Sequence, residues 1–256
     1  MTLPQSLTLG LIQGLTEFLP VSSSGHLILA SRFFGWPDQG LAFDATVHLG
    51  TALALLVYFW NDLLRIARED WRLGAIIFGS SLPAGLSGLA LEGAAERELR
   101  SASVVAVALI AGAVAMFLAD RLVPRARTRD VRKVGWGQGF LVGGFQVLAL
   151  IPGTSRSGAT IVGGLLSRMD RPTAARFAFL LGLPVTAAAG AFKGLTLAAA
   201  GFPPGQAGLL AVGLAAAFAS GLFAVWFLVR YLQRRGLTPF VLYRLALGAA
   251  LLWLAR

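Results

Sequence analysis

The chain alternates between long apolar runs and short polar or basic breaks. Runs long enough to cross about 30 Å of hydrocarbon lie at about 43–60, 73–92 and 101–120, and again at about 173–198, 206–229 and 238–255. Each set follows a pair of shorter runs broken by Pro, Ser and Gly, at about 4–36 and about 134–168. Broken backbone is tolerated at membrane depth only where protein or a polar cavity surrounds it. The pattern therefore predicts six transmembrane helices and two re-entrant helix–loop–helix hairpins.

The polar centres of the two hairpins resemble each other. Residues 13–26 read QGLTEFLPVSSSGH, and residues 146–160 read QVLALIPGTSRSGAT. An offset of 133 positions (146 − 13) aligns Gln13 with Gln146, Ser22 with Ser155, Ser24 with Ser157 and Gly25 with Gly158. Two related polar loops in an apolar chain indicate the two halves of one site.

The halves also predict the overall organisation. Each consists of one hairpin and three crossings, and an odd number of crossings gives repeats of opposite orientation. We expect a single integral membrane domain over 1–256, with a first repeat at 1–120 and a second at 134–256. Inverted repeats whose interrupted helices meet near the midplane are typical of transporters.

Composition supports an all-α polytopic membrane protein. Hydrophobic residues make up 56% of the chain and charged residues only 13%, against about 25% charged in soluble domains. The chain has no cysteine, which excludes disulfides and thiolate metal sites. Its net charge of +10 is better explained by arginines beside apolar spans than by nucleic-acid binding, for which no motif is present.

Lysine and arginine lie mainly on one predicted side of the membrane. The loops at 61–72, 121–133, 168–172 and 230–237 carry most of them, and Arg176 and Arg244 are assigned near the same side. The opposite side is assigned Arg32, Arg97, Arg100, Arg256 and Lys193. The positive-inside rule places the crowded side in the cytoplasm, so both termini are expected in the periplasm.

The second loop is suited to phosphate. A helix that starts there presents free N–H groups, Ser155, Ser157 and Thr160 add hydroxyl donors, and Ser22 adds one from the first loop. Arg156 supplies a planar fork that can hold two phosphate oxygens. An arginine at membrane depth costs at least about 2.5 kcal/mol, so an anionic partner is expected. The alternatives are that Arg156 snorkels or only pairs with Glu17.

The first loop offers acid, base and nucleophile candidates. Glu17 fits three roles: metal ligand, general base, or counter-ion to Arg156. Gln13, one helical turn earlier, could give a divalent cation a further oxygen or could only satisfy loop backbone groups. Ser22 or Ser23 is expected close to His26, as an activated hydroxyl or an acid–base couple, although a buried histidine is often structural. Asp44 and His48 could pair on one helix face, near the site or only in support of the fold.

The two motifs together, Gln13 to His26 and Pro152 to Thr160, resemble the bacterial undecaprenyl-diphosphate phosphatase family, known for bacitracin resistance. The resemblance covers essentially the whole chain. It implies removal of the terminal phosphate of undecaprenyl diphosphate, which recycles the lipid carrier of peptidoglycan synthesis. The residues that match positions the family needs are Glu17, Ser23, His26, Ser155, Arg156 and Thr160.

The resemblance also implies a divalent cation (Mg or Ca), a bacterial inner-membrane location and a site open to the periplasm. The family allows Glu or Gln at the first motif position, and Gln13 weakens a carboxylate metal ligand there. The expected partners are a polyprenyl diphosphate, membrane lipid and a second copy of the chain, but no nucleic acid.

In the expected mechanism Arg156 and the hydroxyls hold the diphosphate while Ser23 attacks with His26 as base. The alternatives are that His26 is the nucleophile or that it activates water. A different class of function also fits the repeat, a lipid-phosphate flippase or anion transporter. Ser23 with His26 favours hydrolysis, because transport needs no nucleophile.

Overall fold

The computed structural model describes residues 1–36, 40–99, 101–122, 126–200 and 205–254. Over these residues the chain is helical, and its β-type pairing is one isolated bridge between Thr128 and Met169. Several orientation residues fall outside this description: Arg100, Arg125 and Arg256 entirely, and the side chains of Arg32, Arg97 and Lys193. Pro37, expected to end the first hairpin, also lies outside it.

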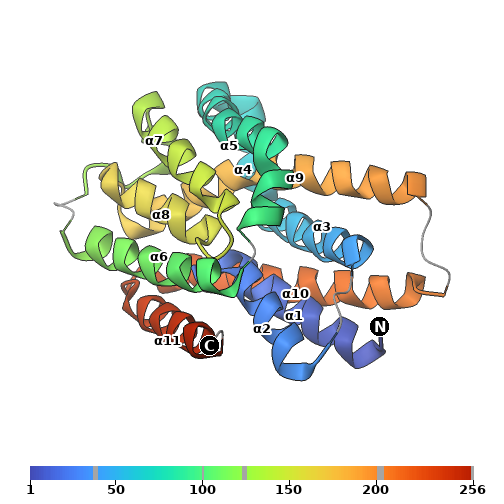
Figure 1. The fold of residues 1–256 in the computed structure, drawn as a ribbon. Helices are drawn as coiled ribbons and strands as arrows, with labels where there is room; N and C mark the ends of the chain where they lie inside the picture. The colour runs from blue at the N-terminus through green and yellow to red at the C-terminus, as the bar shows by residue number, and fades with distance from the viewer. Residues whose placement is uncertain (37–39, 100, 123–125, 201–204, 255–256) are drawn as a thin grey trace.

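The helices follow the predicted order (Figure 1). The first hairpin consists of α1 (Leu3–Phe18) and α2 (Ser23–Phe34), and the second of α7 (Trp136–Val147), the short η2 (Leu148–Leu150) and α8 (Arg156–Leu166). The remaining apolar helices are α3 (Gly40–Tyr58), α5 (Trp71–Glu98), α6 (Ala102–Leu122), α9 (Arg171–Ala200), α10 (Ala207–Tyr231) and α11 (Thr238–Leu254).

Four of these helices, α5, α6, α9 and α10, are long and apolar enough to cross a membrane. A fifth crossing results if α3 and the helix after it form one bent span, and α11 is a shorter apolar helix. The chain is therefore a helical, multi-pass membrane protein. The finer expectation of six spans and two re-entrant hairpins stays a prediction.

One element was not predicted. The basic stretch after the first long run was expected to be a loop, but α4 (Trp60–Glu69) occupies it, at 62° to α3. Leu63 and Ile66 are one turn apart and pack against the main hydrophobic core. Asp62 in the first turn and Arg68 in the last match the helix dipole. Because this stretch carries many charged residues, its sequence did not indicate an amphipathic helix.

Each half packs into the other. The first arm of each hairpin lies on a long helix of the opposite half: α1 on α10, and α7 on α5. Helix α3 lies between α9 and α10, and α6 pairs with α11 (Figure 1). Small residues permit the close approach: a Cβ on Gly14 of α1 would come within 2.0 Å of the Ser220 hydroxyl on α10. This exchange brings the two hairpin loops together.

Adjacent glycines on α7 test the contact with α5. A Cβ on Gly143 would lie 2.0 Å from the carbonyl oxygen of Ser80, whereas a Cβ on Gly144 would meet nothing within 4 Å. We expect Gly143→Ala to cost about 1–3 kcal/mol of stability, because it forces two backbones apart. Gly144→Ala should be neutral or stabilising by up to about 1 kcal/mol. Thermal unfolding in detergent measures both variants, and equal melting temperatures would contradict the packing.

Candidate functional site

The two hairpin loops share one backbone geometry. Ser22 and Ser155, which the repeat aligns, both have positive φ, 74° and 68°, and each directly precedes a helix. The Ser22 hydroxyl lies 3.1 Å from that of Ser24, and the Ser155 hydroxyl lies 3.2 Å from that of Ser157. A left-handed residue other than glycine costs about 1–3 kcal/mol and is typical of functional sites. A serine with positive φ thus directly precedes both α2 and α8.

Hydrogen bonds join the loops to each other. The Gly153 N–H donates to the Ser24 hydroxyl at 3.2 Å, and the Ser157 hydroxyl donates to the Leu19 carbonyl at 3.2 Å. Gly153 has a φ of 96°, and a Cβ there would lie 2.4 Å from the carbonyl oxygen of Val105. The second loop therefore lies directly on α6 and needs glycine at this position.

Arg244 of α11 holds both loops in place. Its side chain is fully buried, and no carboxylate contacts its guanidinium among the described residues. The guanidinium donates instead to backbone carbonyls of the first loop, the second loop and α6, namely Pro20 at 3.4 Å, Gly153 and Thr154 at 3.0 Å each, Ala108 at 3.3 Å and Leu109 at 3.1 Å. Gly112 leaves room for it, since a Cβ there would lie 2.1 Å from a guanidinium nitrogen.

The burial of Arg244 was not predicted. Its charge was assigned to the cytoplasmic edge of the last helix, but the carbonyls of the loops surround it. Arg176, assigned to the same edge, forms an ion pair with Asp62 at 2.9 Å. The sequence does contain a signal for Arg244, because an arginine inside an otherwise apolar helix marks a buried polar function.

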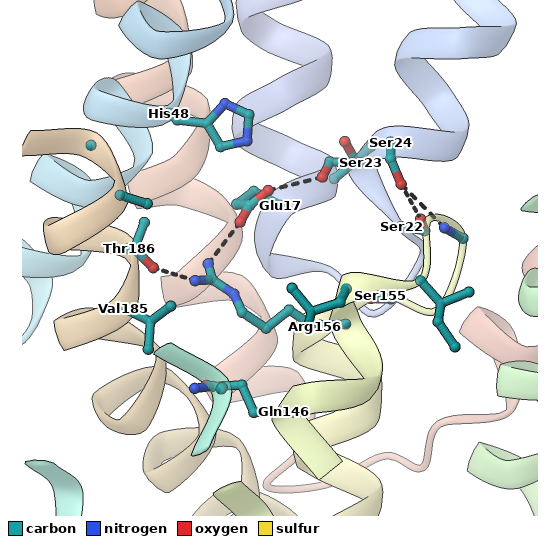
Figure 2. Close-up of a pocket in the computed structure, with 18 residues that line it drawn as sticks. Glu17, Ser22, Ser23, Ser24, His48, Gln146, Ser155, Arg156, Val185 and Thr186 are labelled. Atoms are coloured by element: carbon teal, nitrogen blue, oxygen red, sulfur yellow. Dashed lines mark hydrogen bonds and ion pairs between the residues drawn. The ribbon is translucent and has the colours of Figure 1, made fainter. Parts of the chain in front are cut away.

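A cavity of about 280 Å³ opens between the loops, α3, α5, α7 and α9 (Figure 2). This volume is near the lower end of small-ligand pockets, which hold about 300–1,000 Å³. Five of the predicted site residues line it: Glu17, Ser22, Ser23, Ser155 and Arg156. The loops therefore contribute to one polar cavity, as the repeat suggested.

Three charged or polar groups form a chain in this cavity. The Arg156 guanidinium donates to Glu17 Oε1 at 2.7 Å, and the Ser23 hydroxyl donates to Glu17 Oε2 at 2.8 Å. The Glu17 and Arg156 side chains are 10% and 20% exposed, so their charges compensate each other away from bulk water. Another guanidinium nitrogen of Arg156 contacts the Thr186 hydroxyl and, at 3.4 Å, the Gly182 carbonyl of α9. Arg156 thus keeps partners besides Glu17.

His26 does not join this chain. Its Nδ1 lies 2.7 Å from the Ser22 carbonyl oxygen, and its Nε2 lies 2.6 Å from the Tyr243 hydroxyl. Among the hydrogen bonds of the described residues none joins His26 to Ser23, and His26 is not part of the cavity wall. His26 was expected close to Ser22 or Ser23. Its hydrogen bond to this pair is made only with the backbone carbonyl of Ser22. A catalytic role for His26 stays a prediction.

A second imidazole does face the cavity. His48 of α3 lines it close to Glu17 (Figure 2). Its Nδ1 lies 2.7 Å from the Asp44 backbone carbonyl, which can only accept, so the neutral ring carries its proton on Nδ1. Nε2 is then left as an acceptor. A hydrogen bond thus joins residues 44 and 48 through the Asp44 backbone carbonyl. No signal in the sequence favours His48 over His26 as the imidazole that faces the cavity.

The other predicted residues lie behind the cavity. Thr160 donates to the Arg156 carbonyl at 2.7 Å within α8, and Ser157 bonds to Leu19 and Ser155. Gln13 is fully buried and donates to Glu17 Oε2 at 3.0 Å. These side chains orient the groups that face the cavity; direct phosphate contacts by Ser157 and Thr160 stay predictions.

The donor set for a divalent cation is small. Among the described residues no group of three or more His, Cys, Asp or Glu side chains comes together. Glu17 offers one carboxylate, and the Gln13 amide oxygen is buried without a hydrogen-bond partner. Mg²⁺ is commonly held by one or two carboxylates together with substrate phosphates. The residues present therefore fit a cation that binds with a phosphate ligand, not a preassembled protein site.

Fold and site together define a class: a multi-pass membrane protein with a buried polar cavity built from two hairpin loops. Comparison with known proteins identifies its family. The sequence model of the bacitracin resistance protein BacA matches residues 6–250, and the chain belongs to this family.

Curated relatives extend along nearly the whole chain. An undecaprenyl-diphosphatase of Hahella chejuensis is 44% identical over 99% of both chains. Another, of Trichlorobacter lovleyi, is 44% identical over 97% of this chain and 95% of its own. A third, of Thermomicrobium roseum, is 42% identical over 97% of this chain and 96% of its own. The resemblance read from the two motifs is confirmed.

Replacing Arg244 tests whether it fixes the loops. In Arg244→Met the carbonyls that it serves lose their donor, and each buried group left unpaired costs about 1–3 kcal/mol. We expect a loss of at least about 3 kcal/mol, together with loss of site function. Thermal unfolding in detergent is the measurement. Arg176→Met is the control, because its partly exposed ion pair with Asp62 contributes about 0–1 kcal/mol. Equal melting of the two variants would contradict the role of Arg244.

Proposed function

We propose that the chain is a membrane phosphatase that hydrolyses undecaprenyl diphosphate to undecaprenyl phosphate and inorganic phosphate. In a cell this activity recycles the lipid carrier of peptidoglycan synthesis and confers bacitracin resistance. The similarity to undecaprenyl-diphosphatases over nearly the full length supports it. So does the cavity, where a hydroxyl, a carboxylate and a guanidinium form one hydrogen-bonded chain.

That chain is the observation on which the proposal rests. Binding of an anion needs Arg156 and hydroxyl donors, but it does not need a serine hydroxyl directed at a carboxylate. Ser23 donates to Glu17 at 2.8 Å, an arrangement that suits a nucleophile and its proton acceptor. Phosphoryl transfer depends mainly on positioning and charge stabilisation, and Arg156 meets both needs beside Ser23.

In the proposed reaction Arg156 and loop hydroxyls hold the diphosphate oxygens. Ser23 Oγ attacks the terminal phosphorus, its proton passes to Glu17, and the bond to the bridging oxygen breaks. Undecaprenyl phosphate leaves with that oxygen. Water then attacks the phosphorus of the phosphoserine and the bond from phosphorus to Ser23 Oγ breaks. Glu17 returns its proton to Ser23 Oγ, and inorganic phosphate leaves with the oxygen and the protons of the water. Glu17 is favoured over His26 as acceptor because it already accepts the Ser23 hydrogen bond.

The expected divalent cation, Mg or Ca, belongs to the same proposal. Glu17 would hold it together with oxygens of the diphosphate, and the Gln13 amide oxygen is the nearest further protein donor of the predicted set. When bound, the cation would neutralise part of the diphosphate charge.

The finer architecture is also proposed. The exchange of α1 onto α10 and of α7 onto α5 supports an inverted repeat with two re-entrant hairpins and six crossings. The equal turns at Ser22 and Ser155 support it further. The charge bias places the basic loops in the cytoplasm of a bacterial inner membrane, with both termini and the opening of the site toward the periplasm. The homodimer stays a prediction.

Phosphate release in detergent tests the function. The purified chain should release inorganic phosphate from a prenyl diphosphate, and transport cannot explain turnover where no second compartment exists. Arg156→Ala should reduce the rate about 10³-fold or more, because it removes charge stabilisation of the transferred phosphoryl group. Arg176→Ala, which alters a distant ion pair, is the control. A near-normal rate in Arg156→Ala would refute the role of Arg156 in holding the diphosphate. If the wild type released no phosphate, a flippase or anion transporter would be favoured.

Ser23→Ala tests the nucleophile. Loss of covalent catalysis should leave only slow attack by water, and we expect a fall in kcat of about 10²-fold or more. Rapid quenching of the wild type followed by mass spectrometry should find phosphate on Ser23. A Ser23→Ala variant with normal kcat would eliminate the covalent route through Ser23, and would leave direct attack by water or a phosphohistidine at His26.

A further inference from the structure

Gln146 is a buried side chain without a use in the mechanism so far. It lies on α7, is 2% exposed and lines the cavity. Figure 2 draws it beneath the Arg156 side chain, with Glu17 above. Among the described residues neither its Nε2 nor its Oε1 has a hydrogen-bond partner. A buried amide that only filled space would be replaced by leucine or methionine at lower cost, because its donors and acceptor lose water and gain nothing.

Comparison with the first half of the repeat shows which hydrogen-bond acceptor Gln146 lacks. An offset of 133 aligns it with Gln13 (146 − 13) and aligns Leu150 with Glu17 (150 − 17). In the first half the Gln13 amide donates to Glu17 at 3.0 Å. In the second half leucine stands in place of the carboxylate, so the equivalent amide has no acceptor. The cavity wall therefore contains an unpaired N–H donor at the position where its counterpart holds a negatively charged oxygen.

The side chains that share the cavity with Gln146 indicate which kind of ligand could accept a hydrogen bond from its amide. Arg156 lines the same cavity with a guanidinium, and the described acidic residue of the wall, Glu17, already accepts from Arg156, Ser23 and Gln13. An entering ligand with negatively charged oxygens would meet both the guanidinium and the free amide. A phosphate group has this chemistry, since each oxygen that does not bridge two phosphorus atoms accepts hydrogen bonds.

We infer that Gln146 is a substrate-binding residue whose Nε2 donates to a non-bridging oxygen of the lipid diphosphate. The inference rests on the proposed function and adds a contact to it. Arg156 supplies the charge, and Gln146 supplies a neutral, directional donor from a rigid helix. Inorganic phosphate, the second product, presents the same oxygens and should bind there too.

The experiment compares Gln146→Leu with the wild type in detergent. We expect KM for a prenyl diphosphate to rise about tenfold or more, which is the usual loss for one hydrogen bond to a charged group. The inhibition constant of inorganic phosphate should rise by a similar factor. The melting temperature should stay equal or rise, because the variant removes a buried group that has no partner. Gln146→Glu, which places negative charge in the wall, should weaken phosphate further.

Ser80→Ala is the matched control. Ser80 is also fully buried with an unpartnered hydroxyl, but it is not part of the cavity wall. This variant should melt at an equal or higher temperature and leave KM and phosphate inhibition unchanged. Gln146→Met repeats the test with an unbranched side chain in case leucine does not fit.

Three results would overturn the inference. The first is a Gln146→Leu protein that melts lower but keeps the wild-type KM and phosphate inhibition, as a structural amide predicts. The second is a fall in kcat with unchanged KM. The third is failure of both the leucine and methionine variants to fold. If the wild type releases no phosphate, the proposed function fails, but binding of inorganic phosphate by calorimetry still decides whether Gln146 contributes to an anion site.

Discussion

The site depends on one buried positive charge. Arg244 has no acidic contact among the described residues, and it is solvated by backbone carbonyls that belong to both hairpin loops and to α6. A guanidinium has five donors in a fixed plane, so it imposes one arrangement on the chain segments around it. Because the carbonyl of Pro20 belongs to the first half and those of Gly153 and Thr154 to the second, neither half can form the site alone. The last helix, α11, thus joins one loop from the first quarter of the chain to another from the third.

The two halves share a serine with positive φ at the start of the second hairpin helix but contribute different chemical groups. The offset that aligns Ser22 with Ser155, both with positive φ, also aligns Ser23 with Arg156 (156 − 23 = 133) and Glu17 with Leu150. The first half thus contributes the acid and the hydroxyl, and the second contributes the cation. A symmetric pair of loops would place like charges together, which is costly in a low dielectric. The aligned positions differ where charge has to be balanced.

Much of the architecture could be predicted from sequence, because the length of an apolar run indicates whether it can cross the membrane as a helix. The convergence of Glu17 and Arg156 also followed from the repeat. The directions in which individual side chains point could not be predicted from the repeat. His26 and His48 are both single imidazoles near polar groups in the sequence, and only packing shows that the first contacts Tyr243 and the second faces the cavity. Helix α4 was missed because its charges resemble a loop, and Arg244 because a count of charges by side ignores burial.

The ion pair between Arg156 and Glu17 bears on the order of substrate binding and proton transfer in the proposed reaction. While Arg156 donates to Glu17, the carboxylate is compensated and is a poor acceptor for the Ser23 proton. A diphosphate that competes for the guanidinium would weaken this pair, and Arg156 would stay in place because Thr186 and Gly182 of α9 also hold it. Glu17 would then turn from counter-ion to base only once substrate is bound. Two of the roles considered for Glu17 are thus compatible, since the carboxylate pairs with Arg156 in this structure and would act as base once a diphosphate binds.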